Sequence, residues 1–118
     1  MNVPVEMSKG TIVPIVLKLL SERSMYGYEI IREVDERSEH VFDWKEGTLY
    51  PWLHRLESEG LVESSWSVSS SGRRRKYYGI TRRGMAALEE RTGQWMALRD
   101  AVDAFLVDAI PHTEGAPA

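Results

Sequence analysis

The sequence predicts a mainly α-helical fold with one small β-hairpin and a long C-terminal helix. Apolar residues recur at helical spacing in three segments before residue 60, and a further apolar stripe runs from Met85 to Ala109. Between them, two β-rich stretches flank a Ser- and Gly-rich turn at residues 69–72. The chain has 118 residues, of which 42% are hydrophobic, so we expect one ordinary globular domain.

The first helix is expected to begin near Thr11, because Pro14 is tolerated only in a first turn. Residues 1–8 carry no pattern and are expected to be flexible. Residues 24–28 are predicted to form a turn. A second helix follows this turn, with Ile30, Ile31 and Val34 facing inward. The apolar stripe of the first helix consists of Ile12, Ile15, Val16, Leu19 and Leu20.

The third helix is predicted to start near Gly47, with Thr48 as its N-cap and Pro51 in its first turn. Gly60 ends it, in the position that glycine commonly takes just past a helix. Residues 40–44 precede this helix and are β-branched and aromatic, so they fit either a brief strand or an extended linker. The inward face of the helix carries Leu49, Trp52, Leu53 and Leu56.

The hairpin is predicted from strands at residues 61–68 and 76–80. Thr81 then caps the last helix, which Gly84 and Gly93 weaken locally. Helices followed by a hairpin in this order are typical of a winged helix-turn-helix. The predicted organisation is a winged-helix domain at residues 1–80, a C-terminal dimerisation helix at residues 81–110 and a flexible tail at residues 111–118.

The charge of the chain is distributed unevenly. The net charge is −3, yet residues 61–84 carry six basic side chains against Glu63 alone. An isolated basic cluster is most often a solvated loop that keeps a protein soluble. Here the cluster lies at the tip of the predicted hairpin and next to the third helix, where guanidinium groups could contact phosphates. The acidic residues in the rest of the chain would repel DNA from the other faces of the protein.

The third helix and the hairpin together predict a DNA-binding surface. The helix alone could be a core helix with an ordinary polar face, but it could also lie in the major groove and meet base edges with its N-terminal residues. The hairpin would reach the phosphate backbone or the adjacent minor groove, where arginine is favoured. The candidate residues are Lys45, Thr48, Tyr50, Pro51, His54 and Arg55 in or beside the helix, and Arg73, Arg74, Arg75 and Lys76 in the hairpin.

The residues give little support to other kinds of site. The absence of cysteine removes disulfides, thiolate metal sites and cysteine nucleophiles. His40, His54 and His112 lack metal-ligand spacing, and the chain has no Gly-rich phosphate loop. We therefore expect no enzyme activity, no metal and no cofactor. No apolar run approaches the length of a membrane span, and no signal-peptide core is present, so we expect a cytoplasmic protein without a membrane partner.

Four stretches in register carry a resemblance to the PadR family of bacterial transcriptional regulators. They are residues 25–30 (MYGYEI), 47–51 (GTLYP), 53–62 (LHRLESEGLV) and 72–84 (GRRRKYYGITRRG). The resemblance covers roughly residues 10–95. It implies a winged-helix domain whose C-terminal helix dimerises, usually against the N-terminal helix of the partner. It also implies repression at palindromic operators, localisation at the bacterial nucleoid when DNA is bound, and frequent release by small aromatic effectors.

Position by position, the resemblance adds Tyr26 and Tyr28 to the candidate DNA contacts. Trp95 matches an aromatic position that faces an interfacial cavity in some relatives. On the residues alone, a Trp on an apolar helix stripe is more often core or dimer interface than a ligand platform. We expect Trp95 and Leu98 to be the place where an effector, if one exists, would bind.

The hypothesis from the sequence is a homodimeric, sequence-specific DNA-binding repressor. The alternative is a winged-helix module for protein–protein interaction that never contacts DNA, which the acidic second helix mildly favours. The last helix exposes an apolar stripe that needs a partner. The expected dimer interface comprises Ile12, Ile15, Val16, Leu19, Leu88, Trp95, Leu98, Val102, Phe105 and Leu106.

Overall fold

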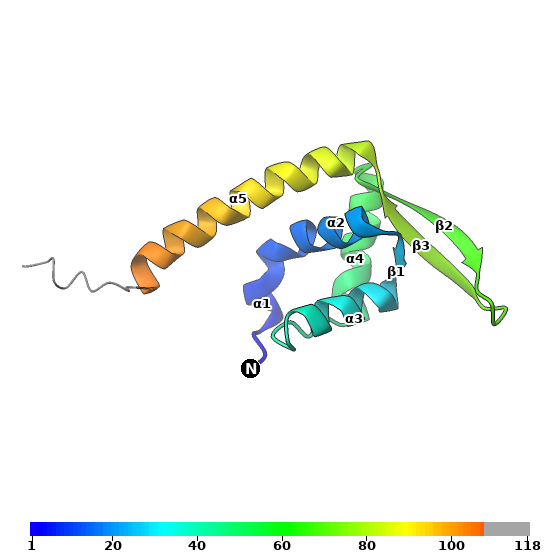
Figure 1. The fold of residues 1–118 in the computed structure, drawn as a ribbon, viewed down its shortest axis with the longest axis horizontal. Helices are drawn as coiled ribbons and strands as arrows, with labels where there is room; N and C mark the ends of the chain where they lie inside the picture. Colours follow the sequence, from blue (N-terminus) through cyan, green and yellow to red (C-terminus); the bar gives the residue numbers. More distant parts are fainter. Residues whose placement is uncertain (108–118) are drawn as a thin grey trace, which may run out of the picture.

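A computed structural model describes residues 1–107 of the chain (Figure 1). The predicted end of the last helix near residue 110 and the tail at residues 111–118 lie outside the described residues. The elements in chain order are α1 (Val5–Ser8), the 3-10 turn η1 (Lys9–Thr11), α2 (Ile12–Glu22), β1 (Met25–Tyr26), α3 (Gly27–Arg37), α4 (Glu46–Ser58), β2 (Val62–Val68), β3 (Arg74–Ile80) and α5 (Arg82–Leu106).

The core lies where α2, α3, α4 and the base of the sheet meet. Apolar side chains at helical spacing give each of the three helices one inward stripe, and burial of these stripes is the main force that holds them together. On α2 the buried stripe is wider than the sequence spacing predicted, because Val13 and Leu17 are also buried. The fully buried core side chains include Ile12, Val16, Leu17, Met25, Ile30, Leu49 and Leu53.

The N-terminal segment contains a short helix that the sequence did not predict. Residues 5–8 form the helical turn α1, in which the buried Ser8 donates its hydroxyl to the carbonyl of Val5 at 3.0 Å. The backbone N–H of Val3 donates to the carbonyl of Val41 at 3.0 Å, which ties the segment to the loop after α3. A four-residue turn is too short to produce the periodic pattern on which the prediction depended.

The structure also decides what the two segments that flank α3 form. Residues 25–26, predicted as part of a turn, form the short strand β1, which pairs antiparallel with β3. No residue of 40–44 is in a strand: His40 belongs to the turn after α3, and residues 42–45 form a linker without regular structure. The chain reverses at Glu39 and His40, which have φ values of 52° and 68°.

Helix α4 begins one residue earlier than predicted, and its N-cap is Lys45 rather than Thr48. The backbone N–H of Thr48 donates to the carbonyl of Lys45 at 2.9 Å, so Thr48 already lies inside the helix. Pro51 consequently falls in the second turn, where it lacks the N–H that would bond to the carbonyl of Gly47. Gly60 ends the helix with a φ of 78°, as predicted.

The hairpin forms the predicted wing. Strands β2 and β3 pair antiparallel from Val62 opposite Ile80 to Val68 opposite Arg74, and the sheet order is β1-β3-β2. Strand β3 begins two residues earlier than predicted, so only Arg73 of the basic cluster precedes it. Because side chains alternate across a strand, the bases at positions 74 and 76 face one side and Arg75 faces the other.

Thr81 joins the wing to both neighbouring helices. As predicted, its hydroxyl caps α5 by accepting the N–H of Gly84 at 3.0 Å. The same hydroxyl donates to the carbonyl of Gly60 at 2.7 Å, and the N–H of Thr81 donates to the carbonyl of Leu61 at 3.1 Å. Gly84 packs against Leu61 so closely that a Cβ at position 84 would overlap the Leu61 carbonyl oxygen.

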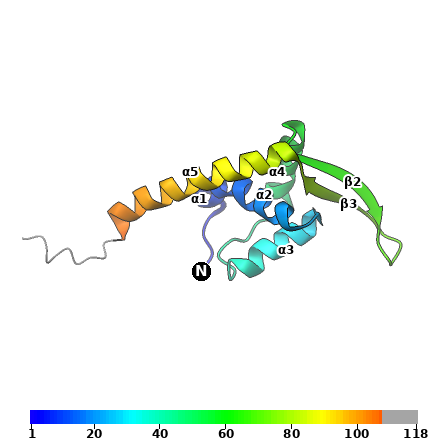
Figure 2. The same cartoon turned by 45° about the horizontal axis from the view of Figure 1, so that its top comes forward.

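Helix α5 projects away from the domain on the side opposite the wing (Figures 1 and 2). The radius of gyration is 17.8 Å, whereas a compact chain of this length would have about 13.5 Å. The difference arises because α5 and the wing extend beyond the core. None of the helices in residues 1–107 combines the length and apolar content that a bilayer crossing requires. The predicted fold class, mainly α with a β-hairpin wing, is confirmed.

We expect Gly84→Ala to destabilise the fold by about 1–3 kcal/mol, because the added methyl group forces the backbones of α5 and Leu61 apart. Gly93→Ala on the same helix is the matched control, since no atom lies within 4 Å of a Cβ there. It should stabilise by about 0.5–1 kcal/mol through helix propensity. Thermal unfolding followed by circular dichroism measures both, and equal shifts in the two variants would contradict the close packing at Gly84.

Candidate nucleic-acid interface

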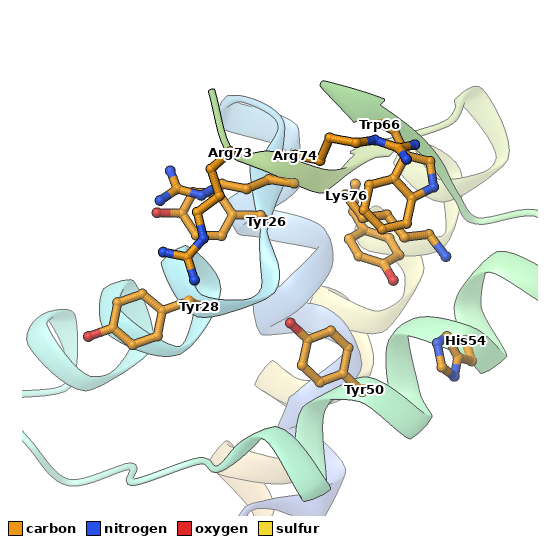
Figure 3. Close-up of a pocket in the computed structure, with 10 residues that line it drawn as sticks. Tyr26, Tyr28, Tyr50, His54, Trp66, Arg73, Arg74 and Lys76 are labelled. Atoms are coloured by element: carbon orange, nitrogen blue, oxygen red, sulfur yellow. The ribbon is translucent and has the colours of Figure 1, made fainter. Parts of the chain in front are cut away.

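An open cleft of about 640 Å³ lies between α4 and the wing (Figure 3). It combines residues from four separate parts of the chain: β1, α3, α4 and the β2–β3 hairpin. The structure brings together eight of the twelve residues that the sequence predicted as DNA contacts. The lining residues are Tyr26, Tyr28, Tyr50, His54, Trp66, Arg73, Arg74, Arg75, Lys76 and Tyr78.

Helix α4 contributes Tyr50 and His54, which are four residues apart and therefore share one helix face. The phenol of Tyr50 packs over Gly27 so closely that a side chain at position 27 would overlap the phenol oxygen. Gly27 thus fixes the place of Tyr50 in the cleft. Burial, assisted by the negative charge of Glu46, raises the pKa of Tyr50 above its ordinary value. Tyr50 therefore keeps its hydroxyl proton at neutral pH and can donate a hydrogen bond.

Each of the three bases in β3 lies over an aromatic ring. The guanidinium of Arg74 is 4.7 Å from the centre of the Trp66 ring, and that of Arg75 is 4.4 Å from the centre of the Tyr26 ring. The ammonium of Lys76 is 5.5 Å from the centre of the Tyr78 ring. Such contacts are worth about 0.5–1 kcal/mol at exposed sites and restrict the long side chains.

The wing arginines lack acidic partners. Within residues 1–107, none of Arg73, Arg74 and Arg75 forms an ion pair with Asp or Glu, whereas Lys76 lies 4.0 Å from Glu57. Other bases of the domain, such as Arg37, are paired. The three arginines therefore give the cleft a concentrated positive charge that no acid in residues 1–107 pairs with. Such a surface suits a polyanion.

The aromatic residues on the β1 side have distinct positions. Tyr26 packs edge-to-face against Tyr77, with 5.4 Å between the ring centres. The backbone N–H of Tyr26 donates to the carboxylate of Glu29 at 3.2 Å, which helps to fix the start of α3. Tyr28 is 59% exposed, and Arg32 lies over its ring at 5.8 Å. Tyr28 thus offers a free hydroxyl at the edge of the cleft.

The other four predicted contacts lie outside the cleft wall. Lys45 is paired with Asp43 at 3.1 Å at the start of α4, and Arg55 contacts Glu59 at 3.3 Å. The third and fourth, Thr48 and Pro51, lie in the first two turns of α4, where Thr48 is half-buried and Pro51 is exposed. These residues flank the cleft along α4 and do not line it.

Two lining residues were missed by the sequence analysis. The sequence pattern predicts Trp66 only as a strand residue, yet it is 59% exposed and lines the cleft. Tyr78 is buried at the base of the wing, where burial and the charge of Glu57 raise its pKa. The placement of both depends on the register of β2 against β3, which sequence periodicity does not give. The one feature of the sequence that could have indicated a role for Trp66 is that a large aromatic residue stands among serines in the strand that pairs with the basic strand.

A second cavity of about 450 Å³ lies beside Trp95. Its wall is mainly apolar and comes from α2, α3, the following linker and α5, through residues such as Ile15, Leu19, Val34 and Phe42. Leu98, predicted together with Trp95 as an effector contact, does not line it, but both residues line a smaller hollow of about 140 Å³.

One rim of this second cavity is a paired charge network. Arg37 donates to both carboxylate oxygens of Glu22, at 2.6 and 3.1 Å, and to Glu33 at 2.9 Å. The bonds to Glu22 raise the pKa of Arg37, and the same bonds lower the pKa of Glu22. The network connects α2 to α3 beside the cavity, so it stiffens that wall.

The expected dimer-interface residues fall into two groups. Ile12, Val16 and Leu19 lie inside the core of the single chain, so their side chains offer no surface to a second copy. The reason is that α5, β3 and α3 of the same chain pack against α2. Ile15 and Leu88 are half-buried. The exposed group lies on α5 and consists of Trp95, Leu98, Val102, Phe105 and Leu106.

No three side chains of His, Asp or Glu in residues 1–107 come together as a metal-binding group. His54 lies in the cleft and His40 contacts Asp35 at 3.0 Å in the loop after α3. The bond to Asp35 raises the pKa of His40. His112 lies outside the described residues.

Comparison with known proteins identifies relatives of this sequence and fold. A transcriptional regulator from Clostridium thermocellum has a TM-score of 0.79 and 30% identity, covering 86% of this chain and 98% of that chain. A PadR-like transcriptional regulator from Bacillus cereus has a TM-score of 0.74 and 34% identity, covering 86% and 96%. An uncharacterized protein of Lysinibacillus sphaericus is 38% identical over 83% of this chain and 90% of its own length.

The family model for the transcriptional regulator PadR-like family matches residues 16–90. This stretch contains α3, α4, the whole wing and the residues of the cleft. The match covers more than half of the chain, and it agrees with the resemblance that the four sequence stretches indicated. The chain is a transcriptional regulator of the PadR-like family.

Proposed function

We propose that this regulator binds double-stranded DNA through the cleft between α4 and the wing. The observation that carries the proposal is the set of three wing arginines, which pair with no acid in the described residues 1–107 and gather beside the exposed face of α4. Phosphate contacts from such a cluster would supply affinity for any duplex. The acidic residues of the chain lie mostly in residues 21–46 and after residue 85, so repulsion favours approach by this one face.

Sequence readout is assigned to α4 in the major groove. Tyr50 and His54 face the cleft and offer polar atoms to base edges, while Thr48 and Pro51 belong to the N-terminal part of the helix, which meets bases in such complexes. Lys45 and Arg55 flank the helix and would contact the backbone on either side. Tyr26 and Tyr28 would hydrogen-bond phosphates from the β1 edge.

Replacing Arg73, Arg74, Arg75 and Lys76 together with Ala should weaken binding to all duplexes by at least about 100-fold at 0.1 M salt, because up to four phosphate contacts are lost. The slope of log affinity against log salt should fall by roughly two to four. Fluorescence anisotropy would measure both, on random DNA and on a duplex that the wild-type protein selects from a random-sequence pool.

Two variants serve as controls for this experiment. Arg82→Ala with Arg99→Ala removes two bases from α5 and should have a much smaller effect per charge. Tyr50→Phe removes a hydroxyl without changing charge, so it should weaken the selected duplex more than random DNA and leave the salt slope unchanged. Wild-type affinity in the quadruple wing variant would refute the wing assignment. A wild-type protein that binds no duplex would favour the protein-interaction alternative.

We further propose that the regulator acts as a homodimer joined through α5. The C-terminal half of α5 exposes Leu98, Val102, Phe105 and Leu106, and Phe105 alone is 85% exposed. A contiguous apolar stripe of this kind on a projecting helix is costly in water unless a partner covers it. A twofold dimer would present two clefts about 34 Å apart, which suits a palindromic operator and repression by occupancy of a promoter.

We expect Phe105→Asp to convert the dimer into a monomer without loss of the fold, because the side chain contacts little of its own chain. Val68→Asp is the matched control, since Val68 is 62% exposed but lies at the end of β2 in the wing, far from the expected interface. Analytical ultracentrifugation at micromolar concentration would distinguish the species. A monomeric wild-type protein, or a dimeric Phe105→Asp variant, would contradict the assignment.

The cavity beside Trp95 is the proposed effector site. It is mainly apolar and includes an indole on which a planar aromatic molecule could stack. It also lies between the DNA-binding domain and α5, so an occupant could change the separation of the two clefts and release DNA.

A compound from a panel of planar aromatics should quench the fluorescence of the wild-type protein, leave that of Trp95→Phe unchanged and weaken DNA binding. The other three tryptophans are present in both proteins and serve as an internal reference. If every compound acts equally on both proteins, or none acts on either, Trp95 has a packing role alone.

A further inference from the structure

Trp66 is a large apolar side chain that the core does not use. It lies in the middle of β2 and is 59% exposed, although burial of an indole is among the strongest contributions to folding. It pairs across the hairpin with Lys76, so Trp66, Lys76 and Arg74 share the face of the wing that looks toward α4. Figure 3 shows the Trp66 ring beside Arg74, on the His54 side of the cleft.

The indole restricts Arg74. The guanidinium lies 4.7 Å from the ring centre, diagonally across the two strands, and no acid among residues 1–107 pairs with it. An arginine stacked in this way loses less conformational freedom when it binds than a free one does, and its N–H donors remain available. Arg75 is held differently, because its side chain points to the opposite face of β3 and lies over Tyr26 of the neighbouring strand β1.

We propose that Trp66 is a positioning residue that holds Arg74 for insertion into the minor groove beside the half-site read by α4. This inference rests on the proposed function. With α4 in one major groove, a wing projecting from the same cleft reaches the next groove along the duplex, which is a minor groove. Narrow A·T-rich minor grooves have an enhanced negative potential that attracts arginine. The pair therefore gives the regulator a preference for A·T-rich sequence at positions that α4 does not contact.

The test is a double-mutant cycle on duplexes that differ only in an A·T-rich or G·C-rich flank of the selected half-site. Trp66→Ala should weaken binding to the A·T-rich duplex about tenfold and abolish the flank preference, while the salt slope stays unchanged because no charge is lost. Arg74→Ala should abolish the same preference and lower the slope by about one. The double variant should bind no more weakly than Arg74→Ala, because Trp66 acts only through Arg74. Trp66→Tyr should restore most of the preference.

Arg75→Ala is the matched control, since it removes an arginine from the other face of the same strand. It should lower the salt slope by about one and keep the flank preference. Equal melting temperatures of Trp66→Ala and wild type would show that the fold is intact. Additive effects of Trp66→Ala and Arg74→Ala, or an unchanged flank preference in Trp66→Ala, would overturn the inference while leaving DNA binding in place. A wild-type protein that binds neither duplex would instead refute the proposed function.

Discussion

The hydrogen-bonded junction between Leu61 and Thr81 determines where every functional part of this regulator points. The Leu61 carbonyl accepts the N–H of Thr81, and the Thr81 hydroxyl links the carbonyl of Gly60 to the N–H of Gly84. The end of α4, both ends of the wing and the start of α5 therefore meet in one cluster. The absence of a side chain at Gly84 lets α5 approach Leu61 closely. The opening of the cleft and the direction of α5 both follow from this joint.

Folding and the proposed binding use different residues. The core of α2, α3 and α4 supplies apolar burial, whereas the wing arginines are not part of that core and pair with no acid among residues 1–107. Aromatic rings take the place of acids around these bases. An aromatic partner restricts a guanidinium without neutralising it, so the charge stays available for phosphates. The family membership and the geometry of the cleft thus support the same surface for DNA.

Local chemistry explains which features the sequence could predict. The inward stripes of α2 and α4 follow from helical spacing, and the Thr81 cap follows from the side chain itself. Features that depend on contacts between distant parts of the chain, or on very short elements, could not be predicted. The position of Trp66 in the cleft depends on its register opposite Lys76, and four residues are too few to predict α1.

The apolar stripe of α2 shows a further limit of prediction from sequence. Spacing identifies an apolar face, but it does not say whether the same chain or a second copy covers that face. Ile12 and Val16 are covered by their own chain, whereas Phe105 is not.

The central claim is that two copies present two clefts to one side of a duplex, and hydroxyl-radical footprinting of the wild-type protein on its selected duplex tests it most directly. The account predicts two protected patches on one face, about 34 Å apart between centres; a single patch, or two patches on opposite faces, would contradict it.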